Sequence, residues 1–297
     1  MRYRTQAALE MAVKAAAKAS PLDTNLAISG FYFHRLLCRM FSEKDRKFVL
    51  KGGLSVLART VDARATRDID LLAQETELGA AAEELRRLAS VDLGDFMAFL
   101  FDKAEPIKSD DEYRSGAKVW FTPTLGGKPL QPLSIDLVVD EVDGLAPEVL
   151  KPADRLDIDG LPVFDYPIYR AECALADKLL AMLETHNGRP SSRVKDLVDA
   201  VVYAKACEID SAILVERVAK EAATRKVELP KAFAIPASWF ENYEASYKKM
   251  AKQAKADDVA PNLENAQELA RKLYEPAFEG HRNHAKWNPG SMRWVEE

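Results

Sequence analysis

The sequence has 297 residues, of which 47% are hydrophobic and 30% are charged, and its formal net charge is -5. A chain of this length can bury the core of one large domain or of two smaller ones. It contains no apolar run of about 18 residues and starts with a charged Ala/Lys segment, so we expect a cytoplasmic protein without a membrane span or signal sequence. The net acidity argues against nonspecific coating of DNA.

The cysteine pattern excludes two further classes of protein. Cys38, Cys173 and Cys207 are an odd count, lack CxxC spacing and lie in apolar helical patterns. We therefore expect reduced core thiols, with neither a disulfide framework nor a zinc site.

The first half of the chain mixes helical and strand patterns. Apolar spacing predicts a helix over residues 5–19 and a second one after Ser20-Pro21, capped by Asp23 or Thr24. A strand over 48–50 ends at Gly52-Gly53, and a helix starts near Leu54. Further strands are predicted over 68–72, 95–104, 118–122 and 133–142, with a helix over 75–89, and the turn-rich PTLGGKP predicts a hairpin between the last two strands.

The second half is predicted to be helical. Residues 144–167 are rich in proline, glycine and aspartate, which is typical of a connection, so we place a domain boundary near Asp165. Helices are expected over about 169–183, 193–206, 211–224, 237–255 and 262–274. The predicted fold class is α+β, with a mixed sheet and flanking helices in residues 1–165 and a helical domain in residues 166–297 that closes the cleft.

Paired carboxylates give the first indication of function. On a strand, Asp68 and Asp70 project to the same side, about 6 to 7 Å apart. Buried together without a cation they would repel, and one would take up a proton. Mg²⁺ prefers such oxygen ligands, and Mn²⁺ is the alternative. Asp136 is the candidate third ligand, because its neighbours Ile135 and Leu137 point to the other face of their strand.

A glycine pair precedes these carboxylates. By itself a DxD pair is a weak signal, since surface strands and turns often carry one. Here Gly52-Gly53 ends a strand and leads into a helix, followed by Ser55. Free backbone N–H groups and the helix dipole at such a turn favour phosphate binding. The combination of a phosphate cradle and metal carboxylates in one unit is far more specific than either part.

Four sequence blocks resemble one family. KGGLS (51–55), RATRDID (64–70), ECALADKLLA (172–181) and RVKDLVD (193–199) resemble, in order and spacing, the nucleotidyltransferase-like AbiEii toxins of type IV toxin-antitoxin systems, also called MenT-like. The resemblance does not extend to the first forty or the last ninety residues.

The resemblance implies a nucleotidyltransferase-like fold and an enzyme that moves a nucleoside monophosphate from an NTP co-substrate, releasing pyrophosphate. It implies catalytic roles for Asp68, Asp70, Lys178 and Asp196, magnesium binding by Asp68 and Asp70, and triphosphate contacts from Gly52, Gly53, Ser55, Lys178 and Arg193. Because the third strand carboxylate varies among relatives, Asp136 as a metal ligand rests on its strand position.

Each helical-domain residue also has a structural interpretation. Lys178 could extend along its apolar helix to solvent, and Asp196 and Arg193 could form an ordinary surface pair at a helix start. Thr66, two positions before Asp68, raises the hypothesis of control by a partner kinase, because a phosphate there would oppose NTP binding.

The acceptor and partners are inferred from the same resemblance. We expect transfer to the 3′ acceptor end of tRNA, which inhibits translation and growth, and a cognate antitoxin that is DNA-binding or kinase-like. Two clusters could contact RNA: Lys248, Lys249, Lys252 and Lys255, and the carboxyl-terminal HRNHAKWNPGSMRW. His281 and His284 fit a metal pair only loosely. The alternatives are a protein side chain or small molecule as acceptor, or a catalytically idle fold that serves as a binding module.

Overall fold

The computed structural model describes residues 3–66, 68–74, 77–107, 115–140, 145–186, 188–280 and 284–296. The chain divides into two compact units. The sheet unit comprises Met1–Val61 and Thr66–Tyr169, and the helical unit comprises Asp62–Ala65 and Arg170–Glu297. Some residues named in the sequence expectations lie outside the described ranges: Arg67 of the RATRDID block, the helix start at Glu75, the strand end at residues 141–142, and residues 281–283 of the carboxyl-terminal cluster.

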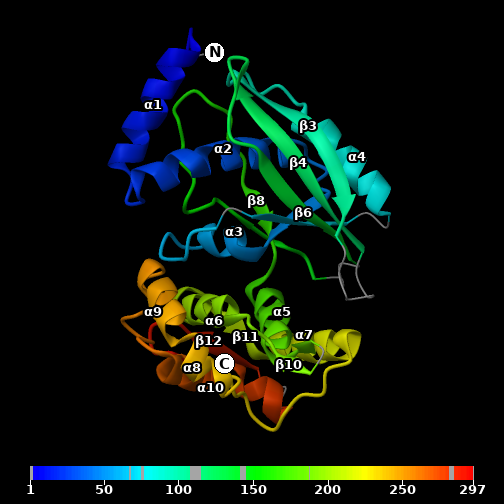
Figure 1. Ribbon diagram of the computed structural model, residues 1–297, viewed down its shortest axis with the longest axis vertical. Coiled ribbons are helices and arrows are strands. Elements are labelled where there is room, and N and C mark those ends of the chain that lie inside the picture. Colours follow the sequence, from blue (N-terminus) through cyan, green and yellow to red (C-terminus); the bar gives the residue numbers. More distant parts are fainter. Residues whose placement is uncertain are drawn as a thin grey trace. The chain divides into compact units, whose positions relative to one another are not determined.

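The sheet unit combines helices with strands (Figure 1). Its helices are α1 (Gln6–Ala19), α2 (Thr24–Met40), α3 (Gly52–Leu57) and α4 (Leu78–Ala89). Its strands are β1 (Phe48–Lys51), β2 (Ile69–Ala73), β3 (Met97–Pro106), β4 (Ser115–Leu125), β5 (Lys128–Pro129), β6 (Leu133–Val139), β7 (Glu148–Leu150) and β8 (Tyr166–Ile168). Asp23 caps α2 as expected, because its carboxylate accepts from the N–H groups of Asn25 and Leu26.

The sheet is mixed, as the sequence predicts. Its strand order is β3-β4-β6-β2-β1-β8-β7, with β5 paired to β4. β2 runs parallel to β6 and antiparallel to β1, while β4 and β6 form the expected antiparallel pair. The strand carrying Asp70 therefore lies in the middle of the sheet, between β1 and β6.

The two faces of these central strands differ in character. Ile69, Ile135, Leu137, Val119 and Phe121 are fully buried on one face. Helix α4 packs against β3, β4 and β6. On the alternating positions, Asp70, Lys118 and Asp136 are half-buried. The strand alternation predicted from Ile135 and Leu137 is thus confirmed, and it leaves the charged positions together on the more open face.

A buried ion network joins α2 to the start of β3. The Asp95 carboxylate accepts from Arg35 Nε at 2.6 Å and from Arg39 Nη2 at 2.7 Å. Asp95 and Arg39 are both fully buried. Burial by itself would raise the pKa of Asp95, but hydrogen bonds and charges from Arg39 and Arg35 outweigh it and lower the pKa.

The helical unit consists of helices and short strand pairs. Its helices are α5 (Ala171–Leu183), α6 (Val194–Ala206), α7 (Ser211–Arg225), α8 (Ser238–Asn242), α9 (Glu244–Gln253) and α10 (Leu263–Glu279). Its strands are β9 (Thr185–His186), β10 (Arg189–Pro190), β11 (Ile209–Asp210), β12 (Ala285–Asn288) and β13 (Arg293–Glu296). The helix expected over 237–255 is divided at Tyr243, and the short strands were not predicted. No helix in the described ranges is long and apolar enough to cross a membrane.

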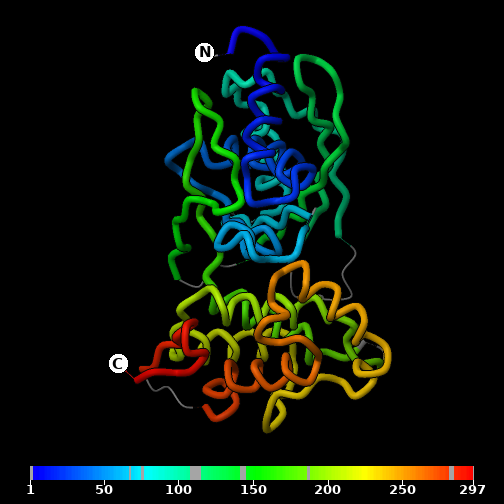
Figure 2. The backbone as a smooth tube through the Cα atoms, turned by 90° about the vertical axis from the view of Figure 1, so that its left-hand side faces the viewer, coloured from blue at the N-terminus to red at the C-terminus, as the bar shows by residue number. Residues whose placement is uncertain are grey.

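The carboxyl-terminal hairpin of β12 and β13 packs into the helical unit, where β12 pairs with β11 (Figure 2). Trp287 is fully buried and donates from its indole to the Ala204 carbonyl at 2.8 Å. The indole N–H of Trp294 donates to the Lys272 carbonyl at 2.9 Å. This carbonyl lacks its usual helical donor, because the residue four positions on is Pro276, which has no N–H. Trp287 lies in the segment that the sequence offered as an RNA contact, but its fully buried ring has no exposed face on which a base could stack.

Replacing Asp95 with asparagine should destabilise the protein by about 3 to 5 kcal/mol, because two arginines would lose a buried counterion. Because its pKa is lowered in the folded protein, Asp95 stabilises the fold at pH values above its pKa in the unfolded chain. This contribution is lost as the pH falls through the folded-state pKa. Urea unfolding across pH should therefore show a shallower acid dependence for Asp95→Asn. Asp102→Asn on exposed β3 is the control, and equal stability of the two variants would contradict the network's role.

Candidate active site

The turn from β1 into α3 brings backbone against a carboxylate. Gly52 has φ +64, and a Cβ built there would lie 1.8 Å from Asp70 Oδ2. Gly53 is buried, and a Cβ there would lie 3.0 Å from the Cβ of Thr66. Only glycine satisfies both constraints at position 52: left-handed backbone and direct approach to the Asp70 carboxylate.

Four charged residues occupy one register row across the sheet. Lys51 on β1 lies opposite Asp70 on β2, Asp70 lies opposite Asp136 on β6, and Asp136 lies opposite Lys118 on β4. Residues directly opposite each other point to the same face, with neighbouring strands about 4.8 Å apart. We call this set the charged row. It brings Asp70 and Asp136 together, as the sequence argument expected, and adds two lysines.

Lys118 is the partner of Asp136. Its Nζ lies 3.0 Å from Asp136 Oδ1, and both side chains are about one-third exposed. The hydrogen-bonded contact with Asp136 is the main cause that raises the pKa of Lys118, and the charges of Asp136, Asp68 and Asp70 raise it further. The ammonium therefore lies within electrostatic reach of all three aspartates.

Asp68 lies just before β2 and is exposed, so it is not a buried strand residue as the sequence suggested. Its backbone N–H donates to Thr66 Oγ1 at 3.4 Å. Thr66 in turn lies against Gly53. The segment leading into Asp70 is thus packed against the glycine turn.

The Ser55 hydroxyl has a local role. It is fully buried and donates to the Gly52 carbonyl at 2.8 Å. This bond supports the first turn of α3 at the residue whose backbone approaches Asp70.

The donor set of the charged row suits a hard divalent cation. Asp70 and Asp136 offer carboxylate oxygens from adjacent strands, and Asp68 lies two residues from Asp70. Among the residues that the structure describes, no three His, Cys, Asp or Glu side chains form a group that could hold a metal. Mg²⁺ is commonly held by one or two carboxylates, with water and substrate phosphates completing its coordination, so these residues fit it.

The helical unit holds a second charged group, the buried ion cluster of Arg64, Lys178, Asp196 and Asp199. Lys178 Nζ lies 2.6 Å from Asp199 Oδ2 and 3.1 Å from Asp196 Oδ1. Arg64 holds both Asp199 oxygens, at 2.8 and 3.0 Å. Burial alone would raise the pKa of Asp199, but Lys178 and Arg64 lower it. Burial likewise opposes the charge on Lys178, while Asp199 and Asp196 raise its pKa.

This geometry gives the helical-domain candidates different positions. Lys178 and Asp196 are buried within the cluster, so Lys178 does not lie along the helix toward solvent. Arg193 is about half exposed, with its Nη1 3.9 Å from Asp196 Oδ2. Arg64 and Asp199 lie in the sequence blocks that carry the resemblance but have no role assigned by it, and none of the four blocks includes Lys118. The register of the hairpin carrying Asp136 was the one available signal for Lys118.

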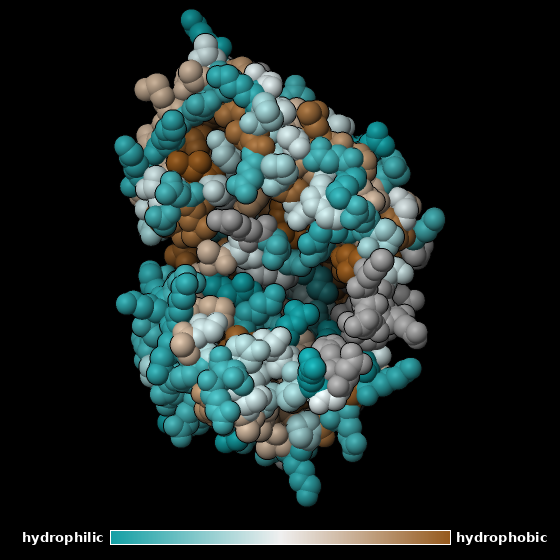
Figure 3. All heavy atoms as spheres, in the orientation of Figure 1, coloured by the Kyte–Doolittle hydropathy of each residue, from teal (hydrophilic) through white to brown (hydrophobic). Residues whose placement is uncertain are grey.

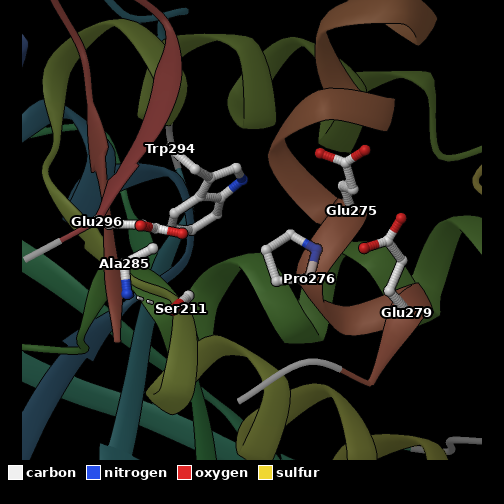
Figure 4. A pocket seen from close by; sticks show the side chains of 7 residues that line it. All are labelled: Ser211, Glu275, Pro276, Glu279, Ala285, Trp294 and Glu296. Carbon is white, nitrogen blue, oxygen red and sulfur yellow. Dashed lines mark hydrogen bonds between the residues drawn. The ribbon is translucent and has the colours of Figure 1, made fainter. Parts of the chain in front are cut away.

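A pocket in the helical unit contains none of the predicted catalytic, nucleotide-binding or metal-binding residues (Figure 4). It is lined by Ser211, Glu275, Pro276, Glu279, Ala285, Trp294 and Glu296. One of its walls is formed where Trp294 covers the break in helical bonding at Pro276, so we interpret the pocket as a consequence of hairpin packing.

Comparison with known protein families places the chain in a class of enzymes. The chain belongs to the family of nucleotidyl transferase AbiEii toxins of type IV toxin-antitoxin systems, whose model matches residues 35–276. The protein is therefore a nucleotidyltransferase of a toxin family, and the resemblance found in the four sequence blocks is confirmed.

Two crystal structures of Helicobacter pylori proteins are similar to the chain. JHP933 has 14% sequence identity and a TM-score of 0.43, covering 86% of this chain and 95% of its own. A second structure, described as a candidate nucleotidyltransferase from the same organism, has 14% identity and a TM-score of 0.43, covering 83% of this chain and 96% of its own. Comparison with curated proteins gives no match.

Gly52→Ala should abolish nucleotidyl transfer, because the new methyl group would displace the Asp70 carboxylate. Gly127→Ala is a matched control, since Gly127 has φ +81 and no atom within 4 Å of a built Cβ. Both variants should lose about 1 to 2 kcal/mol from left-handed strain. If both variants show this loss of stability in thermal unfolding and both retain transferase activity, nucleotidyl transfer does not require the close approach of Gly52 to Asp70.

Asp199→Asn should cost about 3 kcal/mol or more, because Lys178 and Arg64 would lose a buried counterion. Because the pKa of Asp199 is lowered in the folded protein, its carboxylate stabilises the fold at pH values above its pKa in the unfolded chain. This contribution is lost as the pH falls through the folded-state pKa. Chemical denaturation at pH 7 measures the loss. Asp258→Asn is the control because Asp258 pairs with Lys205 while 63% exposed, and a similar loss in both variants would argue against the cluster.

Proposed function

We propose that the protein is a Mg²⁺-dependent enzyme that transfers a nucleoside monophosphate from an NTP to the 3′ acceptor end of tRNA. The observation that carries this proposal is the Gly52 backbone lying against Asp70, with Asp136 in register on the neighbouring strand. A backbone without side chains beside paired carboxylates suits a triphosphate and its accompanying cation.

The residues of the sheet unit would divide the work as follows. Asp70 and Asp136 would hold Mg²⁺ or Mn²⁺ directly, with the exposed Asp68 carboxylate adding negative charge close by, and Gly52 and Gly53 would admit the triphosphate close to the backbone. A bound divalent ion supplies positive charge to the reacting phosphate and to the leaving pyrophosphate. Asp136 is also our candidate for the carboxylate that accepts the proton of the acceptor hydroxyl.

Ser55 would act by supporting the glycine turn. In the helical unit, Lys178 and Asp196 would be essential through the buried ion cluster, and the half-exposed Arg193 would be the side chain available to phosphate. Guanidinium groups recognise phosphate oxygens in pairs, which suits that role.

A basic helix supports RNA as the acceptor. Lys248, Lys249, Lys252 and Lys255 are exposed on α9 or directly after it, where hydrophilic side chains gather on the visible surface (Figure 3). Lysines arranged along one helix can follow a phosphate backbone. Family membership implies an antitoxin partner, which we propose is DNA-binding or kinase-like, and the site of action would be the cytoplasm.

Incubation of the purified protein with total tRNA, a protein extract and each labelled NTP in turn tests this function. Label should enter tRNA at the 3′ end, require Mg²⁺ or Mn²⁺, and fall at least about a hundredfold in Asp70→Asn, as expected when a group that holds the reacting charge is removed. Asp102→Asn should retain activity.

Other outcomes of the same incubation decide between the alternatives. Label in protein or in a small molecule would show that this species, and not tRNA, is the acceptor. If no species is labelled under any condition, the fold would serve as a binding module without catalysis. Transfer that persists in EDTA would contradict the metal assignment.

A further inference from the structure

The charged row contains a cation whose position is not explained by stability. Lys118 and Asp136 form a pair that is about one-third exposed. Ion pairs that solvent reaches in this way contribute little to stability, whereas the structural pair of the same unit, Arg39 and Asp95, is fully buried. The contribution of this ion pair to stability therefore does not explain why Lys118 lies beside Asp136 in the charged row.

Repulsion between the carboxylates supplies that reason. Asp70 and Asp136 lie directly opposite each other on parallel strands, with Asp68 two residues from Asp70. Like charges at this spacing disfavour joint ionisation unless a cation is near. Lys118 is in register with Asp136 and supplies such a cation from this chain itself.

A lysine is suited to give up this position. Its ammonium is a point charge on a flexible four-carbon stem, so it can move several ångströms without a change in the backbone. A divalent ion on Asp136 would repel the ammonium from its present place 3.0 Å from Oδ1. The phosphate oxygens of a nucleotide bound beside the same carboxylates would then offer the ammonium a new negatively charged partner.

We propose that Lys118 exchanges partners during the reaction cycle, holding Asp136 before the metal nucleotide binds and contacting the triphosphate afterwards. This inference rests on the proposed function, because it needs a divalent ion and an NTP at the charged row. It makes Lys118 a nucleotide-binding residue on β4, contributed by a strand that carries none of the recognised motif blocks.

The exchange predicts opposite effects on two binding reactions of the full chain. Lys118→Met removes a cation that competes for Asp136, so Mn²⁺ alone, followed by electron paramagnetic resonance, should bind about five- to tenfold more tightly. The same variant loses a phosphate contact, so non-hydrolysable analogues of the four NTPs, tested one by one with Ca²⁺, should bind about tenfold more weakly.

Two further variants test whether the effect depends on positive charge and on its position at residue 118. Lys118→Arg keeps a cation and should stay within about threefold of wild type in both assays. Lys103→Met removes an exposed lysine from adjacent β3, where Lys103 pairs with Glu105 and lies over Trp120, and should leave both affinities unchanged.

The outcomes that overturn the exchange differ from those that overturn the proposed function. If Asp70→Asn abolishes Mn²⁺ binding but Lys118→Met changes neither affinity, the metal site stands and the exchange is wrong. If Lys118→Met weakens Mn²⁺ and nucleotide together, Lys118 merely holds the carboxylates in place. If wild type binds no Mn²⁺, the metal assignment fails and the exchange fails with it.

Discussion

The approach of the Gly52 backbone to the Asp70 carboxylate is the constraint on which the sheet unit's chemistry depends. It requires a left-handed glycine at the end of β1, an antiparallel β1–β2 pair and a carboxylate facing that turn. Because β2 is also paired in parallel with β6, the same register brings Asp136 beside Asp70. One close contact and one strand register thus bring together the residues to which the proposed function assigns the metal nucleotide.

Two ion systems in this protein illustrate how burial separates structural from functional charge. In the helical unit, Asp199 is almost completely buried and is held by a lysine and a bidentate arginine, so removing it leaves buried charge without compensation. In the sheet unit, Lys118 and Asp136 remain partly exposed, so their pair is weak enough to be exchanged. The first arrangement fixes positions, and the second can respond to a ligand.

The sequence was sufficient for features governed by local pattern. The buried positions of Ile135 and Leu137 follow from strand alternation, and they correctly placed Asp136 on the opposite face. The mixed sheet, the cap of α2 and the helical character after Asp165 follow from the same local signals. Their physical basis is the side-chain period of helices and strands, which any single sequence displays.

Features that depend on distant residues could not be predicted in this way. The Arg64–Asp199 contact joins residues 135 positions apart, and Lys118 becomes a partner of Asp136 only through the register of β4 and β6. Asp68 was expected on the strand, but β2 begins at Ile69. The helix expected over 237–255 is interrupted at Tyr243, which then becomes the residue preceding α9.

A crystal structure of the protein with Mg²⁺ and a non-hydrolysable NTP would test the central claim most directly. The account predicts an ion ligated by Asp70 and Asp136, a triphosphate against the backbone of Gly52 and Gly53, and Lys118 moved from Asp136 to a phosphate oxygen. A nucleotide bound elsewhere, with the contact between Lys118 and Asp136 intact, would contradict it.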